Sequence, residues 1–299
     1  MKIFLRCENS RENGNSYLFG AVFRTLRNLY FTNLNEGLKK IVEEKGDQIL
    51  SLDSDFNQDI QNKQIEDLIA QGVDALFVIP VNPMKVVPAL ESAKEAGIPI
   101  FIVDTPIYDE NLPTSTIASN NYNMGVLIAQ DLMKRKEKAK IAILHYPFFS
   151  TSTIARVEGF MNTIKDLPEY EIVSYKTDEE NYENIKATVR EIVRKHPEIN
   201  VIVPTGDITA MAAISTLKEM KKDQDIFVYG IDGSPEIKKL MKEGQIEVST
   251  AQAPIEMGMT AAETAYTYLE GNPIEKYITI PVVLLTDENL DDYGVATYK

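Results

Sequence analysis

The most constraining feature of the sequence is a regular alternation between short apolar runs and longer amphipathic segments. The apolar runs include YLFGAVF at 17–23, VDALFVIP at 73–80 and IPIFIVD at 98–104. The segments between them have helical spacing of apolar residues and end at glycines such as Gly72 and Gly97. Near-continuous apolar runs are typical of parallel strands that are buried on both faces. The alternation therefore predicts βαβ units with right-handed crossovers.

The same pattern continues through the second half of the chain. Its strand-like runs are KIAILHY, EIVSYKT, NVIVPTG, IFVYGID and IEVSTAQ, separated by helical patterns such as TIARVEGFMNTI. About five or six units precede residue 120 and as many follow it, which is more than one sheet comfortably holds. We therefore predict an α/β fold with two lobes, each a doubly wound parallel sheet.

Composition excludes several classes of partner and cofactor. The 299 residues carry a formal net charge of -14, which argues against a nucleic-acid backbone or an anionic membrane surface as the partner. A single cysteine, Cys7, excludes an internal disulfide. The two histidines, His145 and His196, lack metal-ligand spacing, so we expect structural roles for them and no metal or cofactor.

The sequence also bears on the compartment. No apolar run approaches the roughly 18 residues of a membrane span. The N-terminal MKIFL is shorter than the roughly 7–15 apolar residues of a signal-peptide core. These observations leave open a cytosolic protein or an exported one whose signal is not in this sequence.

Polar and aromatic residues gather where the predicted strands end. In open α/β sheets, ligands bind beyond the carboxyl ends of the strands. Aromatic faces, carboxylates, an amide and a guanidinium together suit a polyhydroxylated ring, whose hydroxyls need fixed donors and acceptors and whose C–H face packs on aromatics. The candidate set is Asn28, Tyr30, Phe31, Asp104, Arg156, Tyr182, Asp232 and Gln252.

Local patterns add expectations about the aromatic pair that follows the first strand. Asn33 and Glu36 have capping-box spacing, and Gly46 is typical of a helix stop, so Tyr30 and Phe31 are expected at the strand-to-helix junction. The structural alternative is that the two rings only pack the helix onto the sheet.

Structural alternatives also remain open for other members of the candidate set. Asp104 and Asp232 are strand-end aspartates, which often form turns. Arg156 is expected to begin a helix, where a surface pair with Glu158 would contribute at most about 1 kcal/mol. Tyr182 is a candidate for an N-terminal cap contact. Their shared position at strand ends favours binding for the set as a whole.

Several segments, in order, resemble type I periplasmic sugar-binding proteins of the ribose/galactose kind, which share their fold with repressor cores. In the first half they are RNLYFTNLNEGLK and QIEDLIAQGVDALFVIPVNPMKVVPALESAKEAGIPIFIVD. In the second half they are ASNNYNMG, TIARVEGF, VYGIDGSPEIKKLMKEGQIEVSTAQAP and IPVVLLTDENLDD. The resemblance covers about residues 17–299, and residues 1–16 resemble no part of the family.

The resemblance implies two lobes joined by a three-segment hinge. The N-terminal lobe would comprise 1–118 and 253–281, and the C-terminal lobe 119–252 and 282–299. Such a protein closes around a monosaccharide or related polyol and presents it to an ABC importer or a membrane-bound sensor. The resemblance also implies that the protein is a monomer and acts outside the cytoplasm, with an export signal that this sequence does not contain.

The resemblance also implies roles for the candidate residues. Asn28 would hydrogen-bond the ligand, three aromatic residues would sandwich it, and four polar residues would hold its hydroxyls. The three charged members are expected to meet in the closed cleft and to lack partners without ligand, so that removing one leaves the stability of the free protein unchanged or slightly raised. The aromatic group is Tyr30, Phe31 and Tyr182, and the polar group is Asp104, Arg156, Asp232 and Gln252.

Four positions depart from the patterns of particular sugars. Ribose receptors have an arginine where this chain has Thr105 and an asparagine where it has Gly206, which argues against ribose. Ser150 and Ser152 stand where glucose and galactose receptors use ring-binding residues of another type. The resemblance therefore predicts a sugar or polyol without identifying it.

Two other function classes stay open. Asp104 and Asp232 would suit the acid/base pair of a glycoside-processing enzyme, although no Gly-x-Ser-x-Gly, HExxH, P-loop or GxGxxG motif appears. A sugar-responsive transcriptional regulator would need an N-terminal helix-turn-helix of about 60 residues. Here the first predicted strand begins near residue 17.

Overall fold

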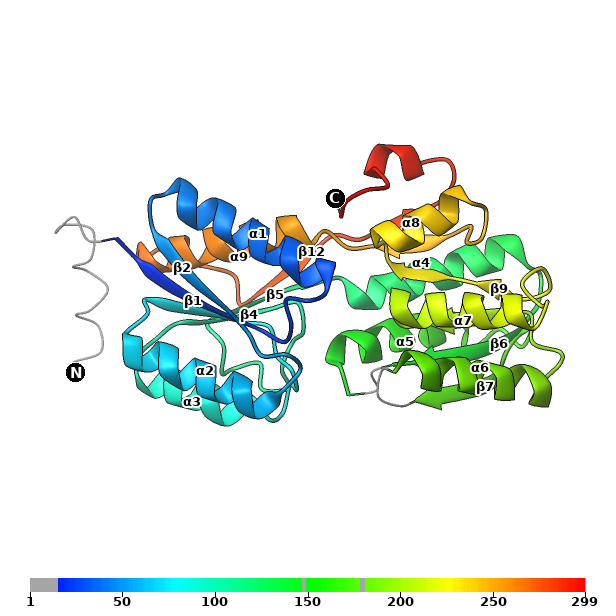
Figure 1. The fold of residues 1–299 in the computed structure, drawn as a ribbon, viewed down its shortest axis with the longest axis horizontal. Coiled ribbons are helices and arrows are strands. Elements are labelled where there is room, and N and C mark those ends of the chain that lie inside the picture. The colour runs from blue at the N-terminus through cyan, green and yellow to red at the C-terminus, as the bar shows by residue number, and fades with distance from the viewer. Residues whose placement is uncertain (1–15, 147–148, 178–180, 299) are drawn as a thin grey trace. The chain divides into compact units, whose positions relative to one another are not determined.

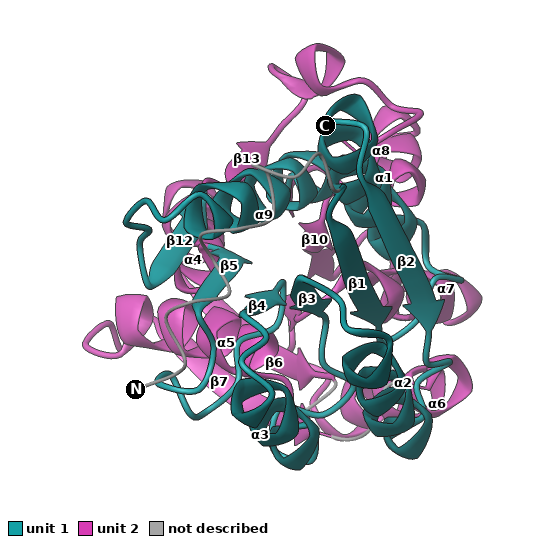
Figure 2. Cartoon of the chain, turned by 90° about the vertical axis from the view of Figure 1, so that its left-hand side faces the viewer, with its two compact units in different colours: residues 1–119, 253–280 teal, residues 120–252, 281–299 magenta. Residues whose placement is uncertain are grey.

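The computed structural model describes residues 16–146, 149–177 and 181–298, so Cys7 lies outside the described residues. The chain divides into two compact units, each assembled from two separated segments (Figure 2). Unit 1 comprises Met1–Ser119 and Ala253–Ile280, and unit 2 comprises Asn120–Gln252 and Pro281–Lys299. The chain therefore passes from one unit to the other three times.

Unit 1 is built on a sheet in the order β12-β5-β4-β3-β1-β2, in which every pairing is parallel. Helices α1 and α9 pack together on one face, and α2 and α3 pack together on the other (Figure 1). Glycines permit the close approach of α1 and α9, because a Cβ at Gly37 would lie 2.2 Å from the carbonyl oxygen of Ile255. The strands are β1 Leu18–Phe23, β2 Gln48–Asp53, β3 Ala75–Val78, β4 Ile100–Val103, β5 Ser115–Ser119 and β12 Tyr277–Ile280, and the helices are α1 Leu29–Glu44, α2 Gln58–Gln71, α3 Val87–Glu95 and α9 Pro254–Leu269.

Unit 2 contains a parallel sheet in the order β7-β6-β8-β9 and a smaller sheet in the order β10-β11-β13. In the smaller sheet, β10 and β11 are parallel, whereas β11 and β13 are antiparallel. The strands are β6 Ala139–His145, β7 Tyr170–Thr177, β8 Val201–Pro204, β9 Phe227–Val228, β10 Gly230–Asp232, β11 Ser249–Ala251 and β13 Val283–Leu285. The helices are α4 Asn121–Arg135, α5 Thr151–Ile164, α6 Tyr182–Lys195, α7 Asp207–Glu219 and α8 Pro235–Lys242, followed by a short 3-10 helix, Leu290–Tyr293.

Each unit has its own apolar interior. The side chains of β3 and β4 are buried throughout, as expected for parallel strands covered on both faces. The predicted glycine stops are confirmed, since Gly46, Gly72 and Gly97 all have positive φ values, between 73° and 78°. Within the described ranges, no helix is both long enough and apolar enough to cross a membrane.

Two predicted helix starts are wrong. The N-cap of α1 is Asn28, whose side chain accepts a hydrogen bond from the backbone N–H of Tyr30 at 2.9 Å, so the capping box at Asn33 does not form. Asn33 instead lies inside the helix and donates to the carbonyl of Leu29 at 2.7 Å. Helix α5 begins at Thr151, which places Arg156 in its second turn rather than at its start.

Candidate ligand-binding site

In unit 1, the candidate residues lie at the carboxyl edge of the parallel sheet. Asn28, Tyr30 and Phe31 form the N-cap and first turn of α1, which follows β1, and Asp104 directly follows β4. The Tyr30 hydroxyl donates to Asp104 Oδ1 at 2.8 Å and thereby connects the two strand ends. The rings of Tyr30 and Phe31 meet edge to face, with centroids 5.2 Å apart.

Asp104 is held in an unusual backbone conformation. Its φ is 71°, a region that residues other than glycine rarely occupy, and its backbone N–H still bonds to the carbonyl of Ile117 at 2.9 Å. Thr105 Oγ1 donates to Asp104 Oδ2 at 2.7 Å, so each carboxylate oxygen receives a hydroxyl. These two hydroxyls orient the Asp104 carboxylate at the end of β4.

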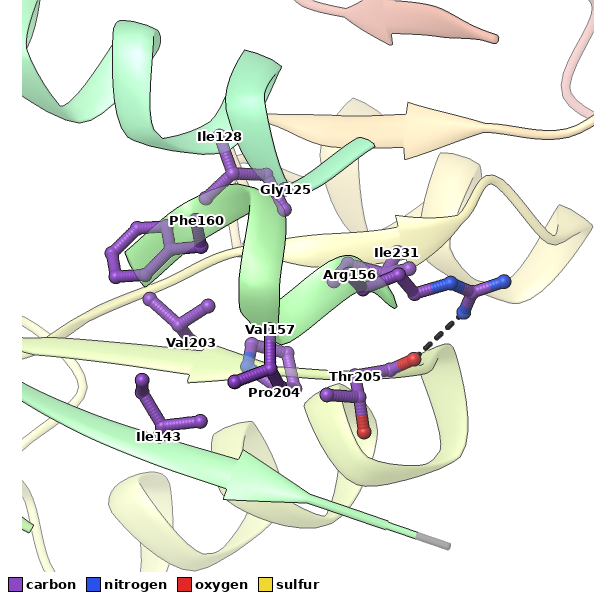
Figure 3. Close-up of a pocket in the computed structure, with 10 residues that line it drawn as sticks. All are labelled: Gly125, Ile128, Ile143, Arg156, Val157, Phe160, Val203, Pro204, Thr205 and Ile231. Carbon is purple, nitrogen blue, oxygen red and sulfur yellow. Dashed lines mark hydrogen bonds between the residues drawn. The ribbon is translucent and has the colours of Figure 1, made fainter. Parts of the chain in front are cut away.

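In unit 2, Arg156 forms the centre of a buried polar network. It pairs with Asp232 Oδ1 at 2.8 Å, and its Nε donates to Asn121 Oδ1 at 2.8 Å. Its Nη1 also donates to the carbonyl of Thr205 at 2.7 Å, as Figure 3 shows. The Arg156 side chain is 7% exposed, so this pair is not a surface pair with Glu158.

Asp232 repeats the geometry of Asp104 on the other unit. It ends β10 with a φ of 94°, and Gln252, the residue after β11, donates its Nε2 to Asp232 Oδ1 at 2.6 Å. Asp232 therefore has a guanidinium and an amide as partners before any ligand binds. The expectation that Arg156 and Asp232 lack partners without ligand is wrong, because the two groups pair with each other. The expectation of unchanged stability on their removal therefore loses its physical basis.

The close packing of α4 against α5 positions Arg156. A Cβ at Gly125 of α4 would lie 1.9 Å from the carbonyl oxygen of Arg156, and one at Gly159 of α5 would lie 2.0 Å from that of Tyr122. The pocket of Figure 3, which Arg156 also lines, is formed mainly by apolar side chains, including Ile128 and Phe160. Only the head of Arg156 is therefore committed to polar partners, and its stem packs on the apolar core.

Asp207, the first residue of α7, is not among the residues predicted for the site. It is 5% exposed, and its two oxygens accept from the backbone N–H groups of Ile231 at 2.9 Å and Ser234 at 2.8 Å. Burial, and secondarily the charge of Asp232, raise the pKa of Asp207 well above its ordinary range. Asp207 thus fixes the backbone on both sides of Asp232. No local motif indicates this role, because its partners lie 24 and 27 residues further along the chain.

The C-terminal segment packs near the same turn of unit 2. Lys238, 1% exposed, donates its ammonium group to the carbonyls of Tyr293 at 3.1 Å and Thr297 at 2.8 Å. Burial raises the pKa of Tyr298, and the charges of Asp207 and Asp232 act in the same direction. This segment therefore contributes to the surroundings of the Asp232 turn.

Tyr182 is the remaining member of the predicted binding set. Tyr182 is the first residue of α6 and is 40% exposed, while Asn181 supplies the cap, so a capping role for Tyr182 is wrong.

His145 Nε2 lies 3.1 Å from Thr153 Oγ1, and its Nδ1 lies 2.7 Å from the Tyr175 hydroxyl. Burial lowers the pKa of His145, which therefore has the partners of a neutral structural histidine. In the part of the chain that the structure describes, no cluster of three or more acidic, histidine or cysteine side chains could hold a metal ion.

Comparison with known proteins defines the family. The family model described as a periplasmic binding protein domain matches residues 19–273, so the chain belongs to that family. The ribose import binding protein RbsB of Bacillus subtilis is 28% identical over 277 residues, which cover 92% of this chain and 89% of the relative. The galactofuranose-binding protein YtfQ of Escherichia coli is 29% identical over 241 residues, covering 78% and 74% of the two chains.

Solved structures agree with the fold. An ABC transporter solute-binding protein from Bacillus halodurans with bound myo-inositol has a TM-score of 0.86 and 26% identity, covering 94% of this chain and 98% of the other. The arabinose-binding component of an ABC transporter from Shewanella sp. ANA-3, bound to L-arabinofuranose, has a TM-score of 0.85 and 28% identity, covering 92% and 93%. The predicted type I periplasmic binding protein fold is confirmed.

Proposed function

We propose that this protein is a solute-binding receptor that closes around a monosaccharide or related polyol and presents it to an ABC importer. A membrane-bound sensor is the second possible recipient. The family consists of binding proteins rather than enzymes, and relatives across most of its length are named for ribose, galactofuranose and apiose. The proposal extends to a monomer that acts outside the cytoplasm, with no nucleic-acid partner.

The observation that carries the proposal is a pair of matched carboxylates. Asp104 on unit 1 and Asp232 on unit 2 both follow or end a strand at positive φ, and both are oriented by side-chain donors. Backbone strain of this kind costs of order 1–3 kcal/mol per residue and tends to persist where function requires it. Oriented carboxylates suit the hydroxyl donors of a polyhydroxylated ligand.

The other residues complete the proposed site. Tyr30 and Phe31 are 6% and 7% exposed, so only the small uncovered part of their rings would meet the C–H face of a sugar, and Tyr182 would supply the opposing ring from unit 2. Asn28 would bond the ligand mainly through its amide nitrogen, because its oxygen already caps α1. Arg156 and Gln252 would donate to ring or hydroxyl oxygens beside Asp232.

Binding would proceed by closure of the two units about the three connecting segments. Ligand contacts from both units stabilise the closed state, and only this difference in affinity shifts the population. Under this proposal, Asp104, Arg156 and Asp232 contact the same ligand, each from a different strand end or helix.

Ribose is not the proposed ligand. The hydroxyl of Thr105 is engaged with Asp104, so it does not replace the guanidinium found there in ribose receptors. Gly206 is the N-cap of α7 and has no side-chain donor for a sugar. The chain therefore lacks two donors of that pattern, which supports a ligand whose hydroxyls are arranged differently from those of ribose.

A thermal-shift screen tests the proposed function. The panel comprises pentoses, hexoses, deoxysugars, polyols and nucleosides, and a ligand at 100 times its Kd should stabilise the protein by about 2.7 kcal/mol. We expect at least one sugar or polyol to raise the Tm, and Asp232→Asn to reduce that shift. Hydrolysis of aryl glycosides by the protein, or stabilisation by nucleosides alone, would contradict the proposal.

A further inference from the structure

Arg24 directly follows β1 and lies between two aromatic rings of unit 1. Its guanidinium carbon is 5.9 Å from the ring centroid of Phe31 and 5.4 Å from that of Phe56. Phe31 meets Tyr30 edge to face, and Tyr30 bonds to Asp104. Arg24 and Phe56 therefore extend the row of candidate binding residues along the same edge of the sheet.

The loop that carries Phe56 is held in a strained conformation. Asp55 and Phe56 have φ values of 49° and 58°, two consecutive non-glycine residues in the left-handed region. The backbone N–H of Phe56 donates to the carbonyl of Arg24 at 2.6 Å, and that of Ser54 donates to Phe23 at 2.9 Å, so the loop is fixed against the end of β1. The Phe56 side chain is nevertheless 54% exposed.

This combination is not explained by core packing. Burial of an aromatic ring would offset strain in its backbone, but the Phe56 ring remains about half in solvent. Stacking with Arg24 provides a partial offset, since a cation over an exposed ring contributes only about 0.5–1 kcal/mol. An exposed, rigidly presented ring beside a guanidinium is a surface on which a ligand can pack.

We propose that Arg24 and Phe56 form a further ligand subsite on unit 1. Arg24 donates to two adjacent oxygen atoms of the ligand, and Phe56 packs against its C–H face. A planar guanidinium matches such an oxygen pair in a bidentate manner, whether the pair is a vicinal diol or a carboxylate. The subsite rests on the proposed function and specifies the chemistry that the ligand presents to unit 1.

Arg27 offers a matched control. It lies three residues from Arg24, carries the same charge, and pairs with Asp55 at 2.8 Å on the surface, where its side chain is 74% exposed. Arg24→Met and Arg27→Met therefore change the net charge equally in the same segment. Only Arg24→Met removes a guanidinium from the proposed subsite.

The test is calorimetric titration of wild type and both variants with L-arabinose, D-galactose, D-allose, myo-inositol and D-galacturonate, together with deoxy analogues of every compound that wild type binds. We expect Arg24→Met to weaken binding about 10- to 100-fold, the range for a lost hydrogen bond to a charged group, and Arg27→Met to bind as wild type does. The loss should disappear for the deoxy analogue that lacks one contacted hydroxyl. If Arg24→Met loses more affinity for D-galacturonate than for D-galactose, the oxygen pair is a carboxylate. If it loses affinity for the neutral sugar, the pair is a diol.

A second variant separates binding from folding. Glycine tolerates the φ of position 56, so Phe56→Gly should keep or raise the Tm of the free protein while lowering affinity. Equal loss across all ligands and their deoxy analogues in Arg24→Met would overturn the subsite, because it would show that Arg24 only positions rings. Affinities of Arg24→Met equal to those of Arg27→Met would also overturn it. If wild type binds no compound of this panel or of the wider screen, the proposed function itself fails.

Discussion

Replacement of Arg156 by methionine should weaken both the free protein and its ligand complex. Methionine keeps the apolar stem of the side chain but removes the ion pair with Asp232 and the bonds to Asn121 and Thr205. Breaking a buried pair by removing one partner costs about 3–5 kcal/mol. Asp232 is 24% exposed and keeps its bond from Gln252, so we expect about 3 kcal/mol, the lower end of this range.

The effect on binding has a separate origin. In the complex, Arg156 would lose its contact to the ligand, and Asp232 would lose the cation that orients it. Loss of one side of a buried charged hydrogen bond typically costs about 2–4 kcal/mol of affinity, which is roughly 30- to 1000-fold in Kd. Urea unfolding of the ligand-free protein and calorimetric titration of the sugar identified by screening would measure the two quantities independently.

Arg190→Met is the control for this substitution. Arg190 pairs with Glu219 on the surface of unit 2, where the two side chains are 33% and 46% exposed. An exposed pair contributes at most about 1 kcal/mol, so we expect a small change in stability and unchanged affinity. If Arg156→Met lowered stability but left the affinity of every ligand intact, Arg156 would be a purely structural residue and the proposed site would be wrong.

Three further substitutions test other parts of the structure. Burial lowers the pKa of His145 below its ordinary 6.5, so the unfolded chain binds the proton more readily, and the stability of the folded protein should fall as the pH drops from about 7 to about 5. His145→Gln should flatten this dependence in urea unfolding at several pH values, and an unchanged dependence would refute the role of His145. Gly125→Ala places a methyl group 1.9 Å from a carbonyl oxygen of α5. It should lower the free energy of unfolding by about 1–3 kcal/mol in the same assay and also weaken ligand binding. Unchanged stability would refute the tight contact. Lys238→Met removes the donor to two carbonyls of the C-terminal segment, so amides of residues 290–298 should exchange hydrogen faster, and equal protection in wild type and variant would refute that role.

The sequence predicted most strands because parallel, doubly covered strands consist of continuous apolar runs. It did not predict β5, Ser115–Ser119, whose composition is largely polar. This strand is buried between β4 and β12, and its polar groups find distant partners, such as the bond from Ser115 to the carbonyl of Glu275. Pairing across 160 residues leaves no local signal.

Local patterns also failed where two residues competed for one role. Asn28 and Asn33 are both acceptable N-caps, and only the extended backbone at Asn28 decides between them. Likewise, IFVYGID is a single apolar run that the structure divides into β9 and β10, with Tyr229 between them. Buried Tyr229 donates its hydroxyl to Asp131, a partner 98 residues away.

The sequence predicted which residues form the candidate site, but not the hydrogen bonds and backbone conformations that connect them. Strand-end location and family resemblance identified Asp104 and Asp232, whereas their positive φ values and oriented oxygens appear only in the folded chain. Asp207 acts through contacts that no motif encodes. A strand-end position therefore predicts that a residue lies at the carboxyl edge of a sheet, and the fold determines which residues it contacts there.

Calorimetric titration of the wild-type protein with the sugar or polyol that gives the largest thermal shift tests the central claim most directly. The proposed receptor should give a saturable one-to-one isotherm, and Asp104→Asn and Asp232→Asn, on different units, should each weaken it. An isotherm without saturation for every sugar and polyol tested, or one that neither substitution changes, would contradict the account.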